Sequence, residues 1–186
     1  MLRLDKTVYS FKELVLLWPN ADPKTIRSRI SYYIKHKDLY HVRRGLYAKN
    51  KDYDRYELAT QIYTPSYISF ETVLVRAGIV FQYYTQIFVA SYQTKTIECD
   101  GQTCTFKSIK SSILCNSMGI EMKENYSIAI PERAYLDILY LNKDYFLDNP
   151  WSLDWGKVFE ILPIYGNKRM EKVVSRHHAA ALNDLK

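Results

Sequence analysis

The sequence predicts an α+β protein in which a basic helical module with a short hairpin precedes a mixed α/β region containing a small antiparallel sheet. Three observations lead to this prediction. Two capped helical segments and a hairpin follow one another within residues 10–48. Continuous and alternating apolar runs between residues 86 and 130 indicate strands, and apolar positions at helical spacing recur from residue 131 onwards.

The charge of the chain is concentrated at one end. The 186 residues, 47% hydrophobic and 25% charged, are typical of a folded protein with a substantial core. Residues 1–51 carry a net charge of +8, whereas residues 52–186 carry −2. This asymmetry favours a polyanionic partner, although a solvated basic surface would give the same count. No apolar run reaches about 18 residues and the first ten residues lack a signal-peptide core, so we expect no membrane partner and a cytoplasmic protein.

The first helix is expected to begin after Ser10, because Glu13 three residues later completes a capping box. Apolar residues between Phe11 and Trp18 would form its inner side. Residues 19–21, Pro-Asn-Ala, end it, and no further helix fits before Ser10.

The second helix is expected over residues 23–36, with Asp22 as N-cap and Pro23 at the first helical position. Its apolar side chains fall on one stripe: Ile26, Ile30, Tyr33 and Ile34. At about 100° per residue, polar and basic side chains occupy the far side, with Arg27 and Arg29 flanking it. These far-side residues are Lys24, Ser28, Ser31, Tyr32 and Lys35.

A hairpin follows, with strands at residues 39–42 and 46–48 around the basic tip Arg43-Arg44-Gly45. Two helices and then a hairpin give the order of a winged helix-turn-helix domain, with residues 39–48 as the wing. We expect a third helix over residues 54–62 that packs under the first two. The predicted domains are therefore residues 1–62, a winged helix-turn-helix domain, and residues 63–186, an α/β domain.

The second domain begins with an extended segment at residues 65–68. Ser69 is expected to cap a short helix over residues 70–77, which Gly78 ends. A buried strand is predicted at residues 86–92, and Asp100-Gly101 marks a hairpin between residues 94–99 and 102–107. Further elements are a strand at residues 126–130 and helices at residues 131–141, 153–162 and 166–185.

Three stretches together resemble the AbiEi-type antitoxins of abortive-infection (type IV) toxin–antitoxin systems. They are Val42 to Ala48, Pro65 to Ser69 with Leu74 and Gly78 after it, and Ile130 to Asp137, and their order and rough spacing match the family across residues 10–140. The resemblance implies a winged-helix DNA-binding domain and a repressor of its own operon that counters a nucleotidyltransferase-like toxin. The chain departs from the family in having no helix before Ser10 and in matching poorly after Asp137.

The hypothesis is therefore a DNA-binding transcriptional repressor, acting as an antitoxin, that binds its own double-stranded operator through helix 23–36 and the wing. Basic residues would contact phosphates or base edges, hydroxyls would donate to them, and the wing would lie along the backbone or minor groove. The predicted DNA-binding residues are Lys24, Thr25, Arg27, Ser28, Ser31, Tyr32, Lys35, Arg43 and Arg44. A homodimer on the DNA stays open. The alternative is a winged-helix protein-interaction module with no DNA role.

The helix that starts at Pro131 carries three charged residues. Arg133 and Asp137 are four apart, which predicts a helical ion pair worth about 0.3–0.5 kcal/mol if exposed, and Glu132 suits the helix dipole. Glu132 and Asp137 lie about 140° apart on a helix, which disfavours paired catalysis by a nuclease or nucleotidyl-transferring enzyme. Because no catalytic motif occurs, we expect no enzymatic activity.

Neither a cofactor nor a metal is predicted. Cys99 and Cys104 lack a second cysteine pair and a nearby histidine, which disfavours zinc, and their diagonal placement across the hairpin disfavours a disulfide. With Cys115 they make an odd number of thiols, as expected in a reducing compartment. Helix 166–185 carries a basic face, interpreted as solvated, as a second DNA contact or as a partner surface, and its His177 lies on the apolar stripe.

Overall fold

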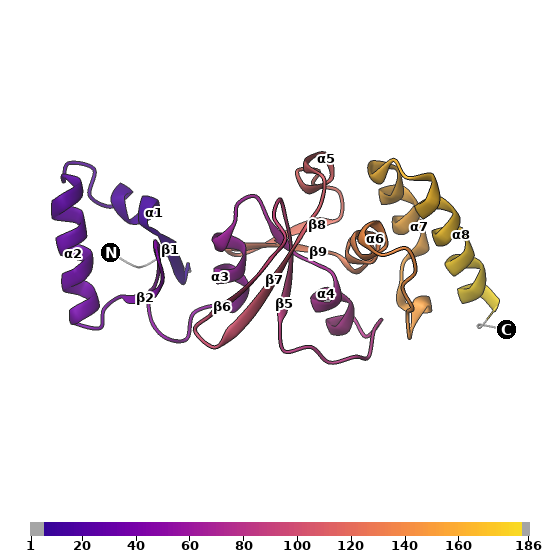
Figure 1. Ribbon diagram of the computed structural model, residues 1–186, viewed down its shortest axis with the longest axis horizontal. Helices are drawn as coiled ribbons and strands as arrows, with labels where there is room; N and C mark the ends of the chain where they lie inside the picture. Colours follow the sequence, from indigo (N-terminus) through magenta and orange to yellow (C-terminus); the bar gives the residue numbers. More distant parts are fainter. Residues whose placement is uncertain (1–5, 184–186) are drawn as a thin grey trace.

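The computed structural model describes residues 6–183 and confirms the α+β class (Figure 1). Its first part is an N-terminal module formed by β1 (Val8–Ser10), α1 (Phe11–Leu16), α2 (Pro23–Lys35), β2 (Tyr40–Arg43) and β3 (Leu46–Ala48). The remaining elements are α3 (Arg55–Ile62), β4 (Tyr67–Ile68), α4 (Glu71–Arg76), β5 (Ile87–Ser91), β6 (Lys95–Cys99), β7 (Gln102–Ser108), α5 (Ser111–Leu114), β8 (Ile120–Lys123), β9 (Tyr126–Ala129), α6 (Pro131–Leu141), η1 (Pro150–Ser152), α7 (Trp155–Ile161), η2 (Leu162–Tyr165) and α8 (Lys168–Asn183). Figure 1 shows the N-terminal module at one end, the large sheet in the middle and α7 and α8 at the other end.

The caps of the first two helices are confirmed. The Ser10 hydroxyl accepts from the Glu13 N–H, and the Glu13 carboxylate accepts from the Ser10 N–H at 2.7 Å. Asp22 accepts from the N–H groups of Lys24 and Thr25 at 2.9 and 3.0 Å. Both helices therefore begin where their side-chain signals place them.

Strand β1 is not predicted by the sequence. It pairs antiparallel with β3, with Val8 opposite Ala48, and β3 pairs with β2, so a three-stranded antiparallel sheet has the order β1-β3-β2. A strand of three residues directly before a helix cap is too short to show an alternating pattern.

The small sheet packs on both of its faces. Tyr9 lies in one core with Leu14, Ile26 and Ile30 of the helix pair. On the other side, Val8, Leu46 and Ala48 belong to the large core of the molecule. The N-terminal module is therefore joined to the rest of the chain through the apolar face of its own sheet.

The sequence predicts that α3 packs under α1 and α2, and this prediction is wrong. Leu58 of α3 belongs to the large core, and the helix contacts β1, β4, β5 and β9. The fully buried Glu57 accepts from the Thr7 N–H at 2.9 Å and the Thr7 hydroxyl at 2.6 Å, and the Gln61 amide donates to the Val8 carbonyl at 2.9 Å. These polar contacts hold α3 beside β1, which periodicity alone could not indicate.

The large sheet has six strands in the order β6-β7-β5-β4-β9-β8. It is mixed rather than small and antiparallel, because β5 pairs parallel with β7 and β4 pairs parallel with β9. The Asp100-Gly101 hairpin is confirmed, with Cys99 opposite Gln102. The residues on its inner face are all buried: Ile97, Cys99, Cys104 and Phe106. Strand β8, which carries mostly exposed side chains, and the one-turn helix α5 are not predicted.

Ser69 does not cap α4. The N-cap position belongs to Phe70, whose φ is +58° and which makes no side-chain cap, whereas the buried Ser69 hydroxyl donates to Asp137 at 2.7 Å. Gly78 does follow the helix, with φ +67°, as predicted. The local capping signal at Ser69 is overridden by a tertiary hydrogen bond.

Arg133 and Asp137 form a fully buried ion pair, not an exposed one, with Nε and Oδ1 3.4 Å apart. Asp137 also accepts from the hydroxyls of Tyr67 at 3.0 Å and Tyr165 at 2.7 Å. Arg133 donates to the Tyr67 hydroxyl at 3.0 Å and to the carbonyls of residues 113 and 118 at 2.7 and 2.9 Å. Helix α6 is buried along residues 132–139, between its neighbours α4, α7 and β9, which is why its charged residues turn inward.

Burial raises the pKa of the Asp137 carboxyl, while Arg133 and the three hydroxyl donors oppose that shift. The carboxyl has direct partners for both of its oxygens. Hydrogen bonds from Ser69, Tyr67 and Tyr165 are what make an ionised group acceptable at this depth.

The last helix begins at Lys168, and the predicted end of helix 166–185 lies partly outside the described residues. Met170 and Val174 of its apolar stripe are fully buried. Arg169 donates to the carbonyls of Leu139 at 2.7 Å and Asn142 at 3.2 Å, at the C-terminus of α6. Within residues 6–183, no helix has the length and apolar character to cross a membrane.

We predict that Asp137→Ala lowers the free energy of unfolding by about 3–5 kcal/mol, because it leaves the Arg133 guanidinium buried without its anion. Equilibrium urea denaturation measures the change. The matched control is Asp144→Ala, which breaks the exposed pair with Arg176 and should cost about 0–1 kcal/mol. Equal losses for the two variants would contradict this role for the buried pair.

Candidate nucleic-acid interface

Helix α2 presents a basic, hydroxyl-bearing face to solvent. Its buried side is fixed by Ile26 and Ile30, which are 1% and 3% exposed. The opposite side brings together six predicted contact residues, all exposed: Lys24, Arg27, Ser28, Ser31, Tyr32 and Lys35. The helix contains no acidic residue. Its exposed face is therefore uniformly cationic or neutral.

Thr25 differs from these predicted contact residues. Its side chain is half-buried, and its hydroxyl donates to the Asp22 carboxylate at 2.5 Å. This bond, with the backbone N–H groups of Thr25 and Lys24, holds the pKa of Asp22 below its usual range. Asp22 is thus ionised at neutral pH and occupies the helix N-terminus, so Thr25 belongs to the cap.

The structure separates the two arginines of the hairpin. Arg44 is exposed in the turn, whereas Arg43 is half-buried and its Nη1 is enclosed without a hydrogen-bond partner among the described residues. Gly45, with φ +79°, presents its carbonyl to the Phe11 N–H at 2.8 Å. The Cys99 thiol donates a hydrogen bond to the Val42 carbonyl at 3.5 Å. The hairpin therefore lies against α1 and the β6–β7 hairpin, and Arg44 is its exposed cation.

The exposed face continues past the predicted residues at the end of α2. The rings of Tyr32 and His36 lie 4.2 Å apart, and both residues are exposed. Lys37 follows with φ +63°, a left-handed conformation that is uncommon for lysine. The four-residue spacing from Tyr32 to His36 is the sequence signal that could have added His36 to the predicted face.

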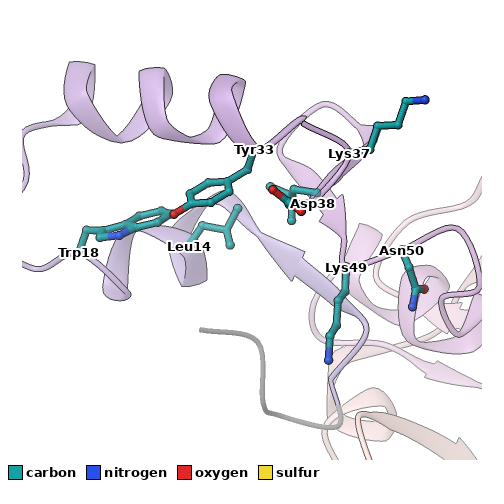
Figure 2. Close-up of a pocket in the computed structure, with 8 residues that line it drawn as sticks. Leu14, Trp18, Tyr33, Lys37, Asp38, Lys49 and Asn50 are labelled. Carbon is teal, nitrogen blue, oxygen red and sulfur yellow. The ribbon is translucent and has the colours of Figure 1, made fainter. Parts of the chain in front are cut away.

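A cavity of about 460 Å³ lies behind α2, on the side away from the exposed face. Figure 2 shows the Trp18 and Tyr33 rings side by side, with Leu14 beside them and Lys37 extending away. The two rings are stacked, with centroids 6.1 Å apart, and the Arg29 guanidinium lies 5.7 Å from the Trp18 ring. These contacts set the rotation of α2 about its own axis and thus the direction of its exposed face.

The charged residues that the sequence singles out on α6 and α8 mostly have partners within the protein. Glu132 is 6% exposed and accepts from the Asp154 N–H at 3.0 Å, so neither it nor Asp137 is open to a substrate. On α8, Arg169 is used at the end of α6, and Arg176 pairs with Asp144 at 3.2 Å. The exposed basic face of α8 consists of lysines 168 and 172 and of Arg176, which is paired.

The three cysteines are free, and Cys99 and Cys104 are buried. Burial raises the pKa of the Cys104 thiol to about 11, so it stays protonated. In the part of the chain that the structure describes, no three His, Cys, Asp or Glu residues gather as metal ligands would. His177 accepts or donates a hydrogen bond with the Tyr135 hydroxyl at 2.9 Å, as a packed histidine does.

Comparison with protein-family models gives no match for this chain, and comparison with curated proteins gives none either. The surface of α2, with its charge and its fixed orientation, is therefore the main support for a function.

We predict that Ile30→Ala lowers the free energy of unfolding by about 2–5 kcal/mol, because it empties a buried position between α2 and α1. Its neighbour Ser31 lies on the exposed face, so Ser31→Ala should change stability by no more than about 0.5 kcal/mol. Urea denaturation of both variants tests the assignment of the two faces. Similar losses would show that α2 is rotated from the orientation described.

Proposed function

We propose that the chain is a DNA-binding transcriptional repressor that acts as the antitoxin of a toxin–antitoxin system. The observation that carries the DNA-binding part is the exposed face of α2, where cations and hydroxyls gather on a helix without acidic residues. Phosphates attract such a face without regard to sequence, and short donors among the cations can reach base edges.

The N-terminal module is proposed to be a winged helix with α2 as its recognition helix. A helix of 13 residues is about 20 Å long, and the major groove admits one helix of this kind. Arg44 would contact the backbone beside it. The enclosed Arg43 is proposed to support the hairpin more than to touch DNA.

The antitoxin part of the proposal rests on the resemblance of three stretches to the AbiEi-type family. Two of these stretches meet in space, since Tyr67 and Ser69 contact Asp137. On this proposal the operator lies upstream of the chain's own gene, a homodimer can bind it, and a nucleotidyltransferase-like toxin is encoded next to it. A toxin gene of that type beside this one would support the role.

We predict that binding to DNA from upstream of the gene weakens steeply with salt. Four exposed cations, Lys24, Arg27, Lys35 and Arg44, give an expected log–log slope of about −4. Arg27→Ala or Arg44→Ala should each reduce the slope by about 1, whereas Lys172→Ala on α8 should leave it unchanged. Fluorescence anisotropy between low and physiological salt gives these slopes. A slope near zero would exclude the proposed phosphate contacts.

Sequence preference tests the hydroxyls separately from the charges. We predict that Ser28→Ala and Ser31→Ala shift the preferred operator sequence by about 1–3 kcal/mol at a contacted base pair while leaving the salt slope unchanged. Selection from a randomised DNA library measures the preference. Uniform weakening across all sequences would instead place these serines at phosphates.

A protein-interaction module is the second candidate, because the enclosure of Arg43 leaves Arg44 as the exposed arginine of the hairpin and so limits its charge toward DNA. The two candidates differ in salt response. A protein partner that stays bound at a salt concentration abolishing DNA binding, together with unchanged partner binding in Arg27→Ala, would favour the second.

A further inference from the structure

A second cavity lies in the central part of the molecule, between α3, α4 and the segment that leads into β5. Its volume is about 410 Å³. The polar and aromatic residues that matter for its chemistry are Arg55, Arg76, Tyr56, Tyr83, Gln86 and Gln102. None of these belongs to the proposed DNA-binding face.

Two guanidinium groups line this cavity, that of Arg55 paired with Asp100 and that of Arg76 without an ion pair in the described part of the chain. Arg55 is positioned by the Asp100 carbonyl, to which its Nη1 donates at 2.8 Å, with the Asp100 carboxylate at 3.5 Å. Arg76 is exposed and has no ion pair within residues 6–183. The acidic residue of the lining, Glu71, is already bound through both oxygens by Lys107 at 2.9 and 2.8 Å. Planar guanidinium groups bind phosphate oxygens well.

Two amide side chains add one acceptor and one donor. The Gln102 Nε2 donates to the Thr85 carbonyl at 2.9 Å, which leaves its Oε1 available as an acceptor. The Gln86 Oε1 accepts from the Thr105 hydroxyl at 2.6 Å, which leaves its Nε2 as a donor. The lining thus offers one donor and one acceptor, the two kinds of group that pair with the polar edge of a nucleobase.

The aromatic part of the lining provides a surface for a flat ring. Tyr83 is 81% exposed. Tyr56 is half-buried and packs edge-on against Tyr126, with centroids 5.5 Å apart. An exposed tyrosine ring beside arginines and amides is suited to stacking with a base.

We propose that this cavity binds a mononucleotide, with its phosphate at Arg55 and Arg76 and its base against Tyr83 and the two glutamines. The volume is of the size that holds one such ligand, within the roughly 300–1,000 Å³ typical of small-molecule sites. The site is independent of the α2 face, so loss of DNA binding would leave this inference intact.

Isothermal titration calorimetry of the full chain tests the site with AMP, GMP, CMP and UMP, and with their nucleosides. At least one nucleotide should bind with a Kd below about 1 mM, and its nucleoside should bind about tenfold more weakly, because the charge-assisted bonds to phosphate are lost. Arg76→Gln should weaken the nucleotide about tenfold without affecting the nucleoside. Tyr83→Ala, an exposed change, should weaken both ligands.

Arg176→Gln is the matched control, since it removes an exposed arginine of α8, outside both the cavity and the α2 face, and should leave nucleotide binding unchanged. Circular dichroism confirms that each variant is folded. The inference is overturned if no nucleotide binds, if nucleoside and nucleotide bind alike, or if Arg176→Gln weakens binding as much as Arg76→Gln. Tighter binding of a single-stranded oligonucleotide, with the same dependence on Arg76, would overturn it in favour of a nucleic-acid strand.

Discussion

The buried pair of Arg133 and Asp137 is the interaction on which the arrangement of the central layers depends. It joins α6 to β4 through Tyr67 and to η2 through Tyr165. Removing two charges from water is costly, and the cost is offset only when every partner is in place. The pair therefore specifies one alignment of helix and sheet, and a shifted alignment would leave a charge without a partner.

A second polar contact fixes the position of the N-terminal module against the central part of the molecule. Glu57 of α3 receives two hydrogen bonds from Thr7, immediately before β1, while the apolar face of the small sheet completes the large core. Helix α2 is thus supported by packed elements on its inner side. Such support suits a surface whose side chains must be held in fixed positions to meet a partner.

Structural features that depend on a few neighbouring residues could be predicted from the sequence. Features that depend on contacts between distant residues could not. The caps at Ser10 and Asp22 and the Asp100-Gly101 turn act over two to four residues and appear where predicted. The parallel pairing of β5 with β7 has no local signal. The exposed row of α2 followed from its 3.6-residue period, whereas the enclosure of Arg43 depends on the packing of a hairpin that begins some 50 residues later.

The contacts of α3 with β1 also occupy backbone groups at one edge of the small sheet. Beside β1, the Gln61 amide donates to the Val8 carbonyl, and Glu57 accepts from the N–H of Thr7, the residue before the strand; on β2, the Cys99 thiol donates to the Val42 carbonyl. Unpaired strand edges recruit strands from other molecules and begin aggregation. Side chains that occupy these backbone groups protect a short sheet from strand addition, so α3 protects the native fold as well as supporting it.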